Sequence, residues 1–265
     1  MITGMKMVKT ALITGASGGI GLEFAKIHAE NGDNLVLVAR SKEKLDALKV
    51  GLEEKYKINV HTIRKDLARQ GSVVELYDEL KTLNISINYL INNAGIGDFS
   101  LFEVSDWNKL ERMINLNVLA LTHLTKMFLP EMVASGDGKI LNVASTAAFQ
   151  PGPAMAVYFA TKAFVLSFSE AINEEVSGKG VSVTALCPGS TESGFHAVAI
   201  GEGKKVKERS LPSAREVAEY GFRAMMKGKP VAIPGLKNKI MATSVRFLPR
   251  SLVVKAAGII QKNKH

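Results

Sequence analysis

The sequence predicts an α/β fold in which helices cover both faces of a doubly wound parallel sheet, in a single domain over residues 1–265. Three observations lead to this class. Short runs rich in Val, Ile and Leu alternate with helix-length segments along most of the chain. These runs hardly alternate between apolar and polar residues, which is typical of strands buried on both faces. A repeated strand–helix order requires crossover helices above and below a parallel sheet, giving three α/β/α layers.

Seven apolar runs are expected to form the strands. They are "TALIT" (10–14), "NLVLVA" (34–39), "INVHTI" (58–63), "INYLIN" (87–92), "GKILNVAS" (138–145), "GVSVTALC" (180–187) and a short "PVAIPG" (230–235). The segments between them predict helices at about 20–31, 41–56 and 71–83, in a long stretch ending near 134, and at 153–177 and 213–226. No repeat, low-complexity tract or linker divides the chain, so one domain is expected.

The composition narrows the class of protein. With 46% hydrophobic residues and one cysteine, Cys187, the chain can build a large core but no intramolecular disulfide, which favours a reducing cytoplasm. The five histidines show no metal-ligand spacing, so no metal site is expected. No apolar run approaches the ~18 residues that span a bilayer, and the N-terminus lacks the apolar region of a secretory signal.

The net charge of +9 is unevenly distributed. Residues 203–265 hold 15 Lys or Arg and 3 Asp or Glu, and no acidic residue follows Glu219. Such asymmetry is typical of contact with nucleic acid, an anionic membrane or an acidic ligand, but a solvated basic surface explains it equally well. The chain shows no nucleic-acid-binding motif and no aromatic residues interleaved with the basic ones, so a nucleic-acid partner is not expected.

The turn after the first expected strand carries a glycine cluster, "TGASGGIG" (14–21), that opens the first helix. Glycine lets the backbone turn tightly and lets a pyrophosphate approach the N–H groups of a helix start, where the dipole favours anions. Tight strand–helix turns use glycine for structural reasons too. The position between the first strand and the first helix favours dinucleotide binding.

The end of the second expected strand distinguishes between the nicotinamide cofactors. A carboxylate about 20 residues beyond the glycine loop would bind the ribose 2′-hydroxyl of NAD. This chain has Ala39 there, followed by Arg40, whose guanidinium can hold a 2′-phosphate instead. We therefore expect NADP(H) to be preferred over NAD(H), with an ordinary solvated arginine as the alternative.

The stretch "YFATK" (158–162) places Tyr158 and Lys162 four residues apart, on one face of an expected helix. The same spacing recurs in Tyr77 and Lys81, so the pair alone does not indicate chemistry. Ser145 ends a strand 13 residues before Tyr158, whereas Arg64 occupies the equivalent place before Tyr77. The first pair is therefore interpreted as a candidate acid/base site and the second as a helix-surface pair.

In this order the motifs resemble those of the short-chain dehydrogenase/reductase family over about residues 8–195. "TGASGGIG" resembles its TGxxxGxG loop, "NNAG" (92–95) and "PGSTES" (188–193) resemble later cofactor motifs, and Tyr158 and Lys162 its YxxxK pair. The resemblance implies a Rossmann-like fold and a catalytic set of Asn117, Ser145, Tyr158 and Lys162. It implies cofactor contacts at Gly15, Ser17, Gly18, Gly19, Ile20, Gly21, Arg40, Asp66, Leu67, Asn93, Ala94, Gly95, Tyr158, Lys162, Pro188, Gly189, Thr191 and Ser193. Gly18 departs from the Lys or Arg of many NADP-preferring relatives, and Ser193 replaces a commoner threonine.

The four candidate catalytic side chains suit different roles. A free tyrosine has a pKa near ~10, and a nearby lysine ammonium is expected to lower it toward useful acid/base range. Ser145 can hydrogen-bond the substrate oxygen where charge develops. By resemblance, Lys162 also holds the nicotinamide ribose and Asn117 positions a proton-relaying water.

The last third of the chain offers two further expectations. Residues 190–212 lack periodicity and suit a substrate lid. The tail, residues 236–265, mixes apolar residues with Lys and Arg. Its apolar side is expected to pack on the body or a neighbouring subunit, and the alternative is peripheral contact with an anionic membrane.

These observations predict an NADPH-dependent reductase of a ketone or aldehyde, reversible as an alcohol dehydrogenase. The expected partner is a small carbonyl or alcohol substrate, and the resemblance implies a homodimer or homotetramer. A non-catalytic NADP-binding sensor or scaffold is the alternative, although such a module has no need of all four candidate catalytic residues.

Overall fold

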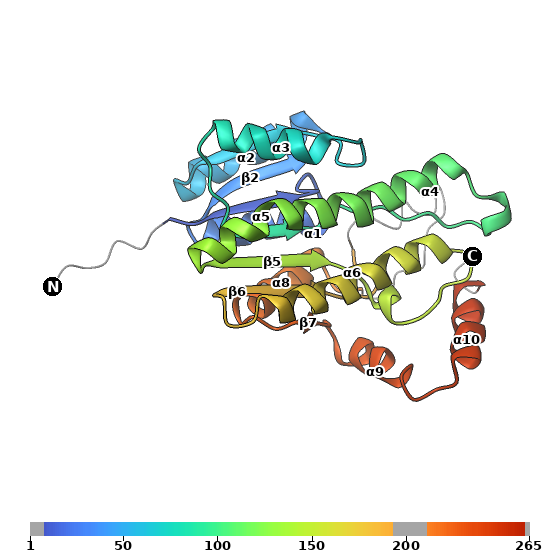
Figure 1. The fold of residues 1–265 in the computed structure, drawn as a ribbon. Coiled ribbons are helices and arrows are strands. Elements are labelled where there is room, and N and C mark those ends of the chain that lie inside the picture. The colour runs from blue at the N-terminus through green and yellow to red at the C-terminus, as the bar shows by residue number, and fades with distance from the viewer. Residues whose placement is uncertain (1–7, 193–210, 263–265) are drawn as a thin grey trace.

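A seven-stranded parallel sheet organises the chain, and the computed structural model describes residues 8–192 and 211–262 (Figure 1). The strand order is β3-β2-β1-β4-β5-β6-β7, so the winding direction reverses between β1 and β4. The strands are β1 (Thr10–Thr14), β2 (Asn34–Ala39), β3 (Val60–Arg64), β4 (Tyr89–Asn92), β5 (Gly138–Val143), β6 (Val181–Leu186) and β7 (Val231–Ala232). The predicted doubly wound α/β fold is confirmed.

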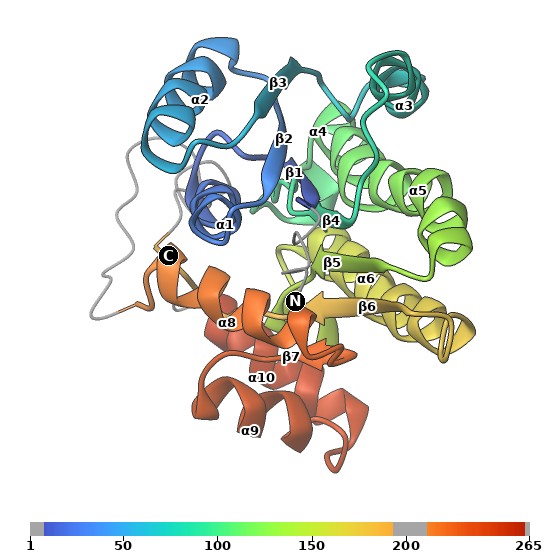
Figure 2. The ribbon, with the colours of Figure 1, turned by 90° about the vertical axis from the view of Figure 1, so that its left-hand side faces the viewer.

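The strands are apolar on both faces because each face is covered by helices. Leu12 of β1 lies in a core cluster with α3 (Ser72–Thr82) and α5 (Leu121–Ser135). Its neighbours Ala11 and Ile13 lie in a second cluster with α1 (Gly19–Glu30), α2 (Lys42–Tyr56) and α8 (Ala214–Met226). Figure 2 shows the resulting three layers, with α6 (Ala156–Glu175) on the same side as α5.

The long helix expected to end near residue 134 ends at Ser135, but it is not uniform. It begins as α4 (Trp107–Ile114), passes through a π-helical turn at Asn115–Ala120 and continues as α5. A π turn inserts an extra residue into the helical ladder and so re-aims the side chains around it. In this chain the re-aimed segment contains Asn117.

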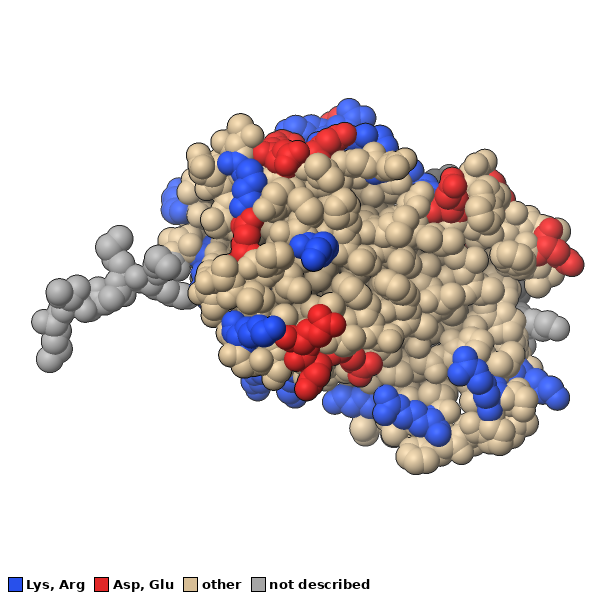
Figure 3. Space-filling view, viewed as in Figure 1, with Lys and Arg blue, Asp and Glu red and all other residues tan. Residues whose placement is uncertain are grey.

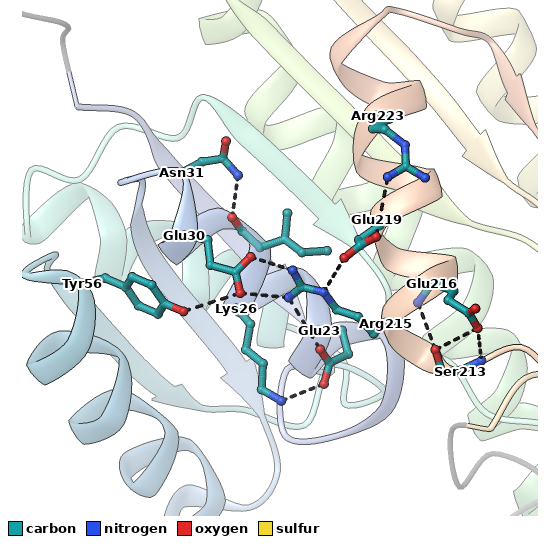
Figure 4. Close-up of polar contacts among 11 residues, drawn as sticks. Glu23, Lys26, Glu30, Asn31, Tyr56, Ser213, Arg215, Glu216, Glu219 and Arg223 are labelled. Carbon is teal, nitrogen blue, oxygen red and sulfur yellow. Dashed lines mark hydrogen bonds and ion pairs between the residues drawn. The ribbon is translucent and has the colours of Figure 1, made fainter.

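Helix α8 is joined to α1 by ion pairs that radiate from one arginine (Figure 4). Arg215 donates to both carboxylate oxygens of Glu30, at 3.0 and 2.6 Å, and to Glu219 at 2.8 Å. A capping box begins this helix, with Ser213 and Glu216 bonded to each other's backbone. Charge pairing therefore supplements the apolar packing of α8 on α1.

The described part of the C-terminal tail is helical. Two helices, α9 (Leu236–Ser244) and α10 (Arg250–Lys262), lie beyond the β7 edge of the sheet (Figure 2). Pro249 separates them, because proline disfavours helical geometry in the residue before it. Among the helices of the described residues, none has the length and apolarity needed to cross a membrane.

Candidate active site

The candidate site residues lie at the carboxyl edge of the sheet, where the winding direction reverses between the neighbouring strands β1 and β4. In doubly wound sheets the helices that follow such strands leave in opposite directions and open a crevice between them. The glycine loop follows β1, "NNAG" follows β4, Ser145 follows β5 and "PG" follows β6. The order of the strands therefore brings four separate motifs to one place.

The loop after β1 accepts only glycine at two positions. Gly15 has φ +68°, and a Cβ there would lie 2.8 Å from Asn93 Nδ2. A Cβ on Gly21 would lie 2.4 Å from Gly15 O and from Asn93 Nδ2. Asn93 in turn donates from Nδ2 to Thr14 O at 2.9 Å, and Thr14 Oγ1 accepts from the backbone N–H groups of Asn93 and Ala94, both at 3.0 Å. The "NNAG" motif thus supports the loop.

The start of α1 fits an anionic ligand. Its N-cap, Gly18, provides no side-chain cap, and the first turn carries no acidic residue. A Cβ on Gly18 would meet nothing within 4 Å, so this side of the loop is open. Uncapped N–H groups at the positive end of a helix suit a pyrophosphate, so the residues present fit a dinucleotide.

A pocket of about 350 Å³ lies at the ends of β2 and β3, lined by Arg40, Arg64, Lys65, Asp66, Arg69 and Glu75. Arg40 and Arg64 become neighbours because Ala39 is paired with Arg64 in the parallel register of these strands. Lys65 and Arg69 pair with Glu75, whereas Arg40 and Arg64 make no ion pair with a carboxylate of the described residues. These two guanidinium groups give the pocket its excess positive charge.

The side chain of Asp66, expected to contact the cofactor, is held in place by hydrogen bonds. Its Oδ1 accepts from Ala68 N at 3.1 Å, and its Oδ2 accepts from Arg112 of α4 at 2.7 Å. Burial acts to raise the pKa of Asp66, but its bonds from Arg112 and Ala68 lower it below the ordinary value. The carboxylate is therefore ionised and oriented at neutral pH beside buried Leu67.

Asn117 is buried within the π turn and joined to the loop after β4. Its Oδ1 accepts from Ile96 N at 3.0 Å, and its Nδ2 donates to Ile96 O at 2.9 Å. Nδ2 also lies 3.2 Å from Thr161 Oγ1, on the helix that carries Tyr158. Asn117 thus connects α6 with the "NNAG" loop, and its role in proton relay stays a prediction.

Ser145, Tyr158 and Lys162 lie together between β5 and α6. Ser145 caps a short 3₁₀ turn, with Oγ accepting from Ala147 N at 3.1 Å, and it also hydrogen-bonds Tyr158. Lys162 Nζ donates to Val143 O at 2.7 Å and lies 5.8 Å from the centre of the Tyr158 ring. Tyr158 and Lys162 are buried, at 9% and 5% exposure.

The expected lowering of the Tyr158 pKa by Lys162 is outweighed by burial in this structure. Burial raises the pKa of Tyr158 to about 12, and the hydrogen bond with Ser145 lowers it by less. Burial also lowers the pKa of Lys162 to about 8, because an ammonium loses its hydration there. The sequence suggested a tyrosine with a lowered pKa. Desolvation reverses the direction, and Ser145 is the neighbour that opposes it.

The repeated spacing at Tyr77 and Lys81 has a different environment, as expected for a helix-surface pair. Lys81 Nζ bonds Glu131 of α5 at 2.5 Å, and Tyr77 donates to the same carboxylate. The bond to Glu131 raises the pKa of Tyr77.

The remaining predicted residues follow β6 or fall outside the described part of the chain. Pro188 O lies 3.4 Å from Ser145 Oγ, and Thr191, largely buried, bonds Gly189 O at 3.0 Å. A Cβ on Gly189 would lie 2.8 Å from the side chain of Asn238 in α9. Ser193 and most of the proposed lid over 190–212 lie outside the described residues. Cys187 is buried, and burial raises the pKa of its thiol to about 12.

Two supporting residues, Arg64 and Arg69, were missed in the sequence, and Thr14 was identified only as part of the loop motif. Thr14 anchors the "NNAG" loop through its hydroxyl, and Arg64 with Arg69 lines the pocket beside Arg40. The basic stretch "RKDLAR" (64–69), which follows the third apolar run, could have indicated that Arg64 and Arg69 belong to the site. Thr14 carried no signal beyond its place in the loop motif.

A narrow cleft borders Tyr158. Its lining includes the apolar side chains of Phe102, Leu110, Met113 and Met155, together with Asp98, Ser100 and Ser105. Within the described residues, no group of three or more His, Cys, Asp or Glu side chains could hold a metal ion.

Known proteins resemble this chain in sequence and in fold. Residues 9–201 match the family described as short chain dehydrogenase. The very-long-chain 3-oxoacyl-CoA reductase of Homo sapiens is 37% identical over 185 residues, which cover 67% of this chain and 58% of the reductase. The chain thus spans about three fifths of that relative.

Two solved structures match over nearly their whole length. A short-chain dehydrogenase from Sphingobium yanoikuyae in complex with NADPH has a TM-score of 0.83 and 34% identity, covering 92% of this chain and 95% of that one. The bulky-bulky ketone specific alcohol dehydrogenase from Comamonas testosteroni has a TM-score of 0.78 and 32% identity, covering 91% and 92%. The chain therefore belongs to the short-chain dehydrogenase family.

Proposed function

We propose that this protein is an NADPH-dependent reductase of a ketone or aldehyde, reversible as an alcohol dehydrogenase. The observation that carries the proposal is the hydrogen-bonded Ser145 and Tyr158 pair beside buried Lys162, at the sheet edge where the dinucleotide cradle lies. A bound nicotinamide cofactor would supply or accept the hydride. The side chains of this protein would orient the substrate and transfer the proton.

Tyr158 acts as the proton donor to the carbonyl oxygen, because its pKa of about 12 keeps the phenol protonated at neutral pH. Ser145 holds that oxygen by hydrogen bonding while negative charge develops on it. Lys162, with a pKa of about 8, is protonated over much of the neutral range and stabilises the phenolate left after proton transfer. Burial of Tyr158 and Lys162 strengthens these interactions by excluding water.

The preference for NADPH rests on the pocket at the ends of β2 and β3. Arg40 and Arg64 make no ion pair with the described carboxylates, so they are available to a 2′-phosphate. Charge-assisted bonds from guanidinium groups to phosphate are strong and directional. Arg40→Ala with Arg64→Ala should weaken NADPH binding at least tenfold and leave NADH binding within about threefold. Equal weakening of both cofactors, or tighter binding of NADH by the wild type, would contradict this assignment.

We propose a ketone with an extended apolar substituent as the substrate class. The lining of the cleft beside Tyr158 includes the apolar side chains of Phe102, Leu110, Met113 and Met155 as well as Asp98, Ser100 and Ser105. Two proteins similar to this chain are described as a very-long-chain 3-oxoacyl-CoA reductase and a bulky-bulky ketone specific alcohol dehydrogenase. NADPH oxidation should be screened over aldehydes, bulky ketones, steroids and 3-oxoacyl thioesters of increasing chain length. Higher kcat/KM for the longer apolar ketones is expected.

Tyr158→Phe tests the chemistry, with Tyr77→Phe as the matched control from the repeated spacing. The first variant should lose at least a hundredfold in kcat and keep its NADPH dissociation constant within about threefold, since acid/base catalysis contributes ~10²–10⁴. The second should keep full turnover. Retained turnover in Tyr158→Phe refutes the assignment. Tight NADPH binding by the wild type with no turnover on any substrate would favour the sensor or scaffold instead.

We further propose a homodimer or homotetramer. On the face formed by α5 and α6, the area right of the centre in Figure 3 carries few charged residues, whereas charged residues gather toward the left. Leu119 of the π turn and Phe164 of α6 are exposed by 56% and 41%. An apolar helical face of this kind suits a self-complementary contact. Light scattering coupled to size-exclusion chromatography measures the mass, and a monomer would exclude the proposal.

A further inference from the structure

The C-terminal pair, defined as α9, α10 and their connection over residues 236–262, exposes an unusual number of apolar side chains. Seven of the eighteen exposed large hydrophobic residues of the described chain lie in it, each more than half exposed. They are Leu236, Ile240, Phe247, Leu248, Leu252, Ile259 and Ile260. Scattered apolar residues are normal on a surface, whereas a concentration in one segment indicates an interaction site.

Helix α10 is apolar on both faces. Val253 and Ala257 point inward, at 7% and 4% exposure, and a Cβ on Gly258 would lie 3.4 Å from Pro153. Leu252 and Ile259 are exposed by 54% and 62%, and their spacing of seven places them on one outward stripe. A surface helix normally turns charged and polar residues outward. The inner face of α10 is therefore packed on the body, and the outward apolar face is available to a partner.

The charge of the C-terminal pair is of one sign. Its exposed cations are Lys237, Lys239, Arg246, Arg250 and Lys255, and none forms an ion pair with a carboxylate of the described residues. No acidic residue follows Glu219 in the sequence. At the lower right of Figure 3, where α10 lies, Lys and Arg are visible and Asp and Glu are not.

This charge distinguishes between the partners that an apolar face could take. A self-complementary contact would bring the same basic surfaces of two copies together, and like charges oppose such a contact. An anionic lipid surface offers negative headgroups to the cations and an apolar boundary to Leu252, Phe247 and Ile259. The combination of exposed apolar side chains with cations that have no carboxylate partner among the described residues therefore favours a bilayer.

We propose that the C-terminal pair binds peripherally to a membrane that contains anionic lipids. Pro153, against which α10 packs, lies in the loop that leads into α6 and Tyr158. Docking through α10 would hold this side of the candidate active site close to the lipid surface. The enzyme could then take a long-chain apolar substrate directly from the lipid bilayer in which it dissolves. This consequence rests on the proposed function, whereas the membrane contact does not.

Vesicle co-sedimentation of the full chain tests the proposal. Vesicles of phosphatidylcholine alone are compared with vesicles of phosphatidylcholine and phosphatidylglycerol. The wild type should bind the anionic vesicles at least tenfold more tightly, and added salt should weaken the binding, since each basic residue near an anionic surface contributes about fivefold. Leu252→Ser with Ile259→Ser should reduce the binding at least tenfold, because burial of these side chains is lost. Lys237→Gln with Lys255→Gln should do the same.

Two control double variants distinguish binding through the C-terminal pair from nonspecific binding to vesicles. Val50→Ser with Leu83→Ser removes exposed apolar side chains elsewhere, and Lys44→Gln with Lys179→Gln removes exposed cations elsewhere. Both should bind as the wild type does, and all four variants should keep its melting temperature and its NADPH dissociation constant.

Absence of wild-type binding to either vesicle, or equal loss in the control double variants, overturns the proposal. So does a change in oligomeric mass caused by Leu252→Ser with Ile259→Ser in the absence of vesicles, which would assign the face to a second copy. Loss of turnover with intact vesicle binding would instead count against the proposed function alone.

Discussion

Asn117→Ala is the substitution that most directly tests how the π turn supports the site. The side chain is 1% exposed and bonds both backbone groups of Ile96 and the hydroxyl of Thr161. Alanine removes these bonds and leaves the Ile96 N–H and C=O without them. An unsatisfied buried polar group costs ~1–3 kcal/mol, and the partial exposure of Ile96 places each group near the low end.

Two such groups and the small cavity left by the amide give a loss of about 3 kcal/mol in unfolding free energy. For a domain of this size, ~2–4 °C accompany each kcal/mol, so the melting temperature should fall by about 6–12 °C. Far-UV circular dichroism during heating measures it. Asn108→Ala is the control, because Asn108 is exposed on the same helical stretch and should change stability by less than ~0.5 kcal/mol. An Asn117→Ala protein that melts within a degree of wild type, or an equal loss in the control, would refute the reasoning.

Three further substitutions have expected outcomes. Gly21→Ala should weaken NADPH binding at least tenfold and lower the melting temperature, because the added Cβ would lie 2.4 Å from a backbone oxygen. Gly51→Ala in α2 is the control, because a Cβ there would meet nothing within 4 Å, and it should stabilise the protein by ~0.5–1 kcal/mol. Arg215→Ala should cost about 1 kcal/mol at pH 7 in chemical denaturation, given the exposure of its partners. Arg215 lowers the folded pKa of Glu30, so this stabilisation is present above pH 4.5 and is lost as the pH falls through the folded value. Lys162→Met should remove a rise in stability of about 2–3 kcal/mol between pH 8 and 10.5, since the unfolded chain binds the extra proton across that window.

Each of these expectations has an outcome that contradicts it. Normal NADPH affinity in Gly21→Ala would show that the loop adjusts at no cost. An Arg215→Ala stability gap that widens in acid would mean that Glu30 is not the linked group. A parallel pH dependence of stability in Lys162→Met and wild type would show that Lys162 titrates as a solvated lysine.

The fold was predictable because the signals are local. The strands β1 and β2 match their apolar runs to the residue, since both faces of each are covered and all but the first residue of each is buried. The other strands are one to four residues shorter than their runs, because the ends of the runs lie in loops. The family motifs were also readable, as each requires particular residues at fixed spacing. The tail was harder, because its apolar residues do not show which face is packed.

The sequence by itself determined the doubly wound fold, the family and the set of candidate site residues, because strand burial, glycine turns and motif order are properties of short stretches. Only the tertiary structure decided which residues from distant segments of the chain lie next to each other. The β2–β3 register placed Arg64 beside Arg40, and the π turn joined Asn117 to Ile96. Burial, a property of the whole fold, raised the pKa of Tyr158 although a lysine lies nearby. Such effects arise between segments far apart in the chain, where no local pattern records them.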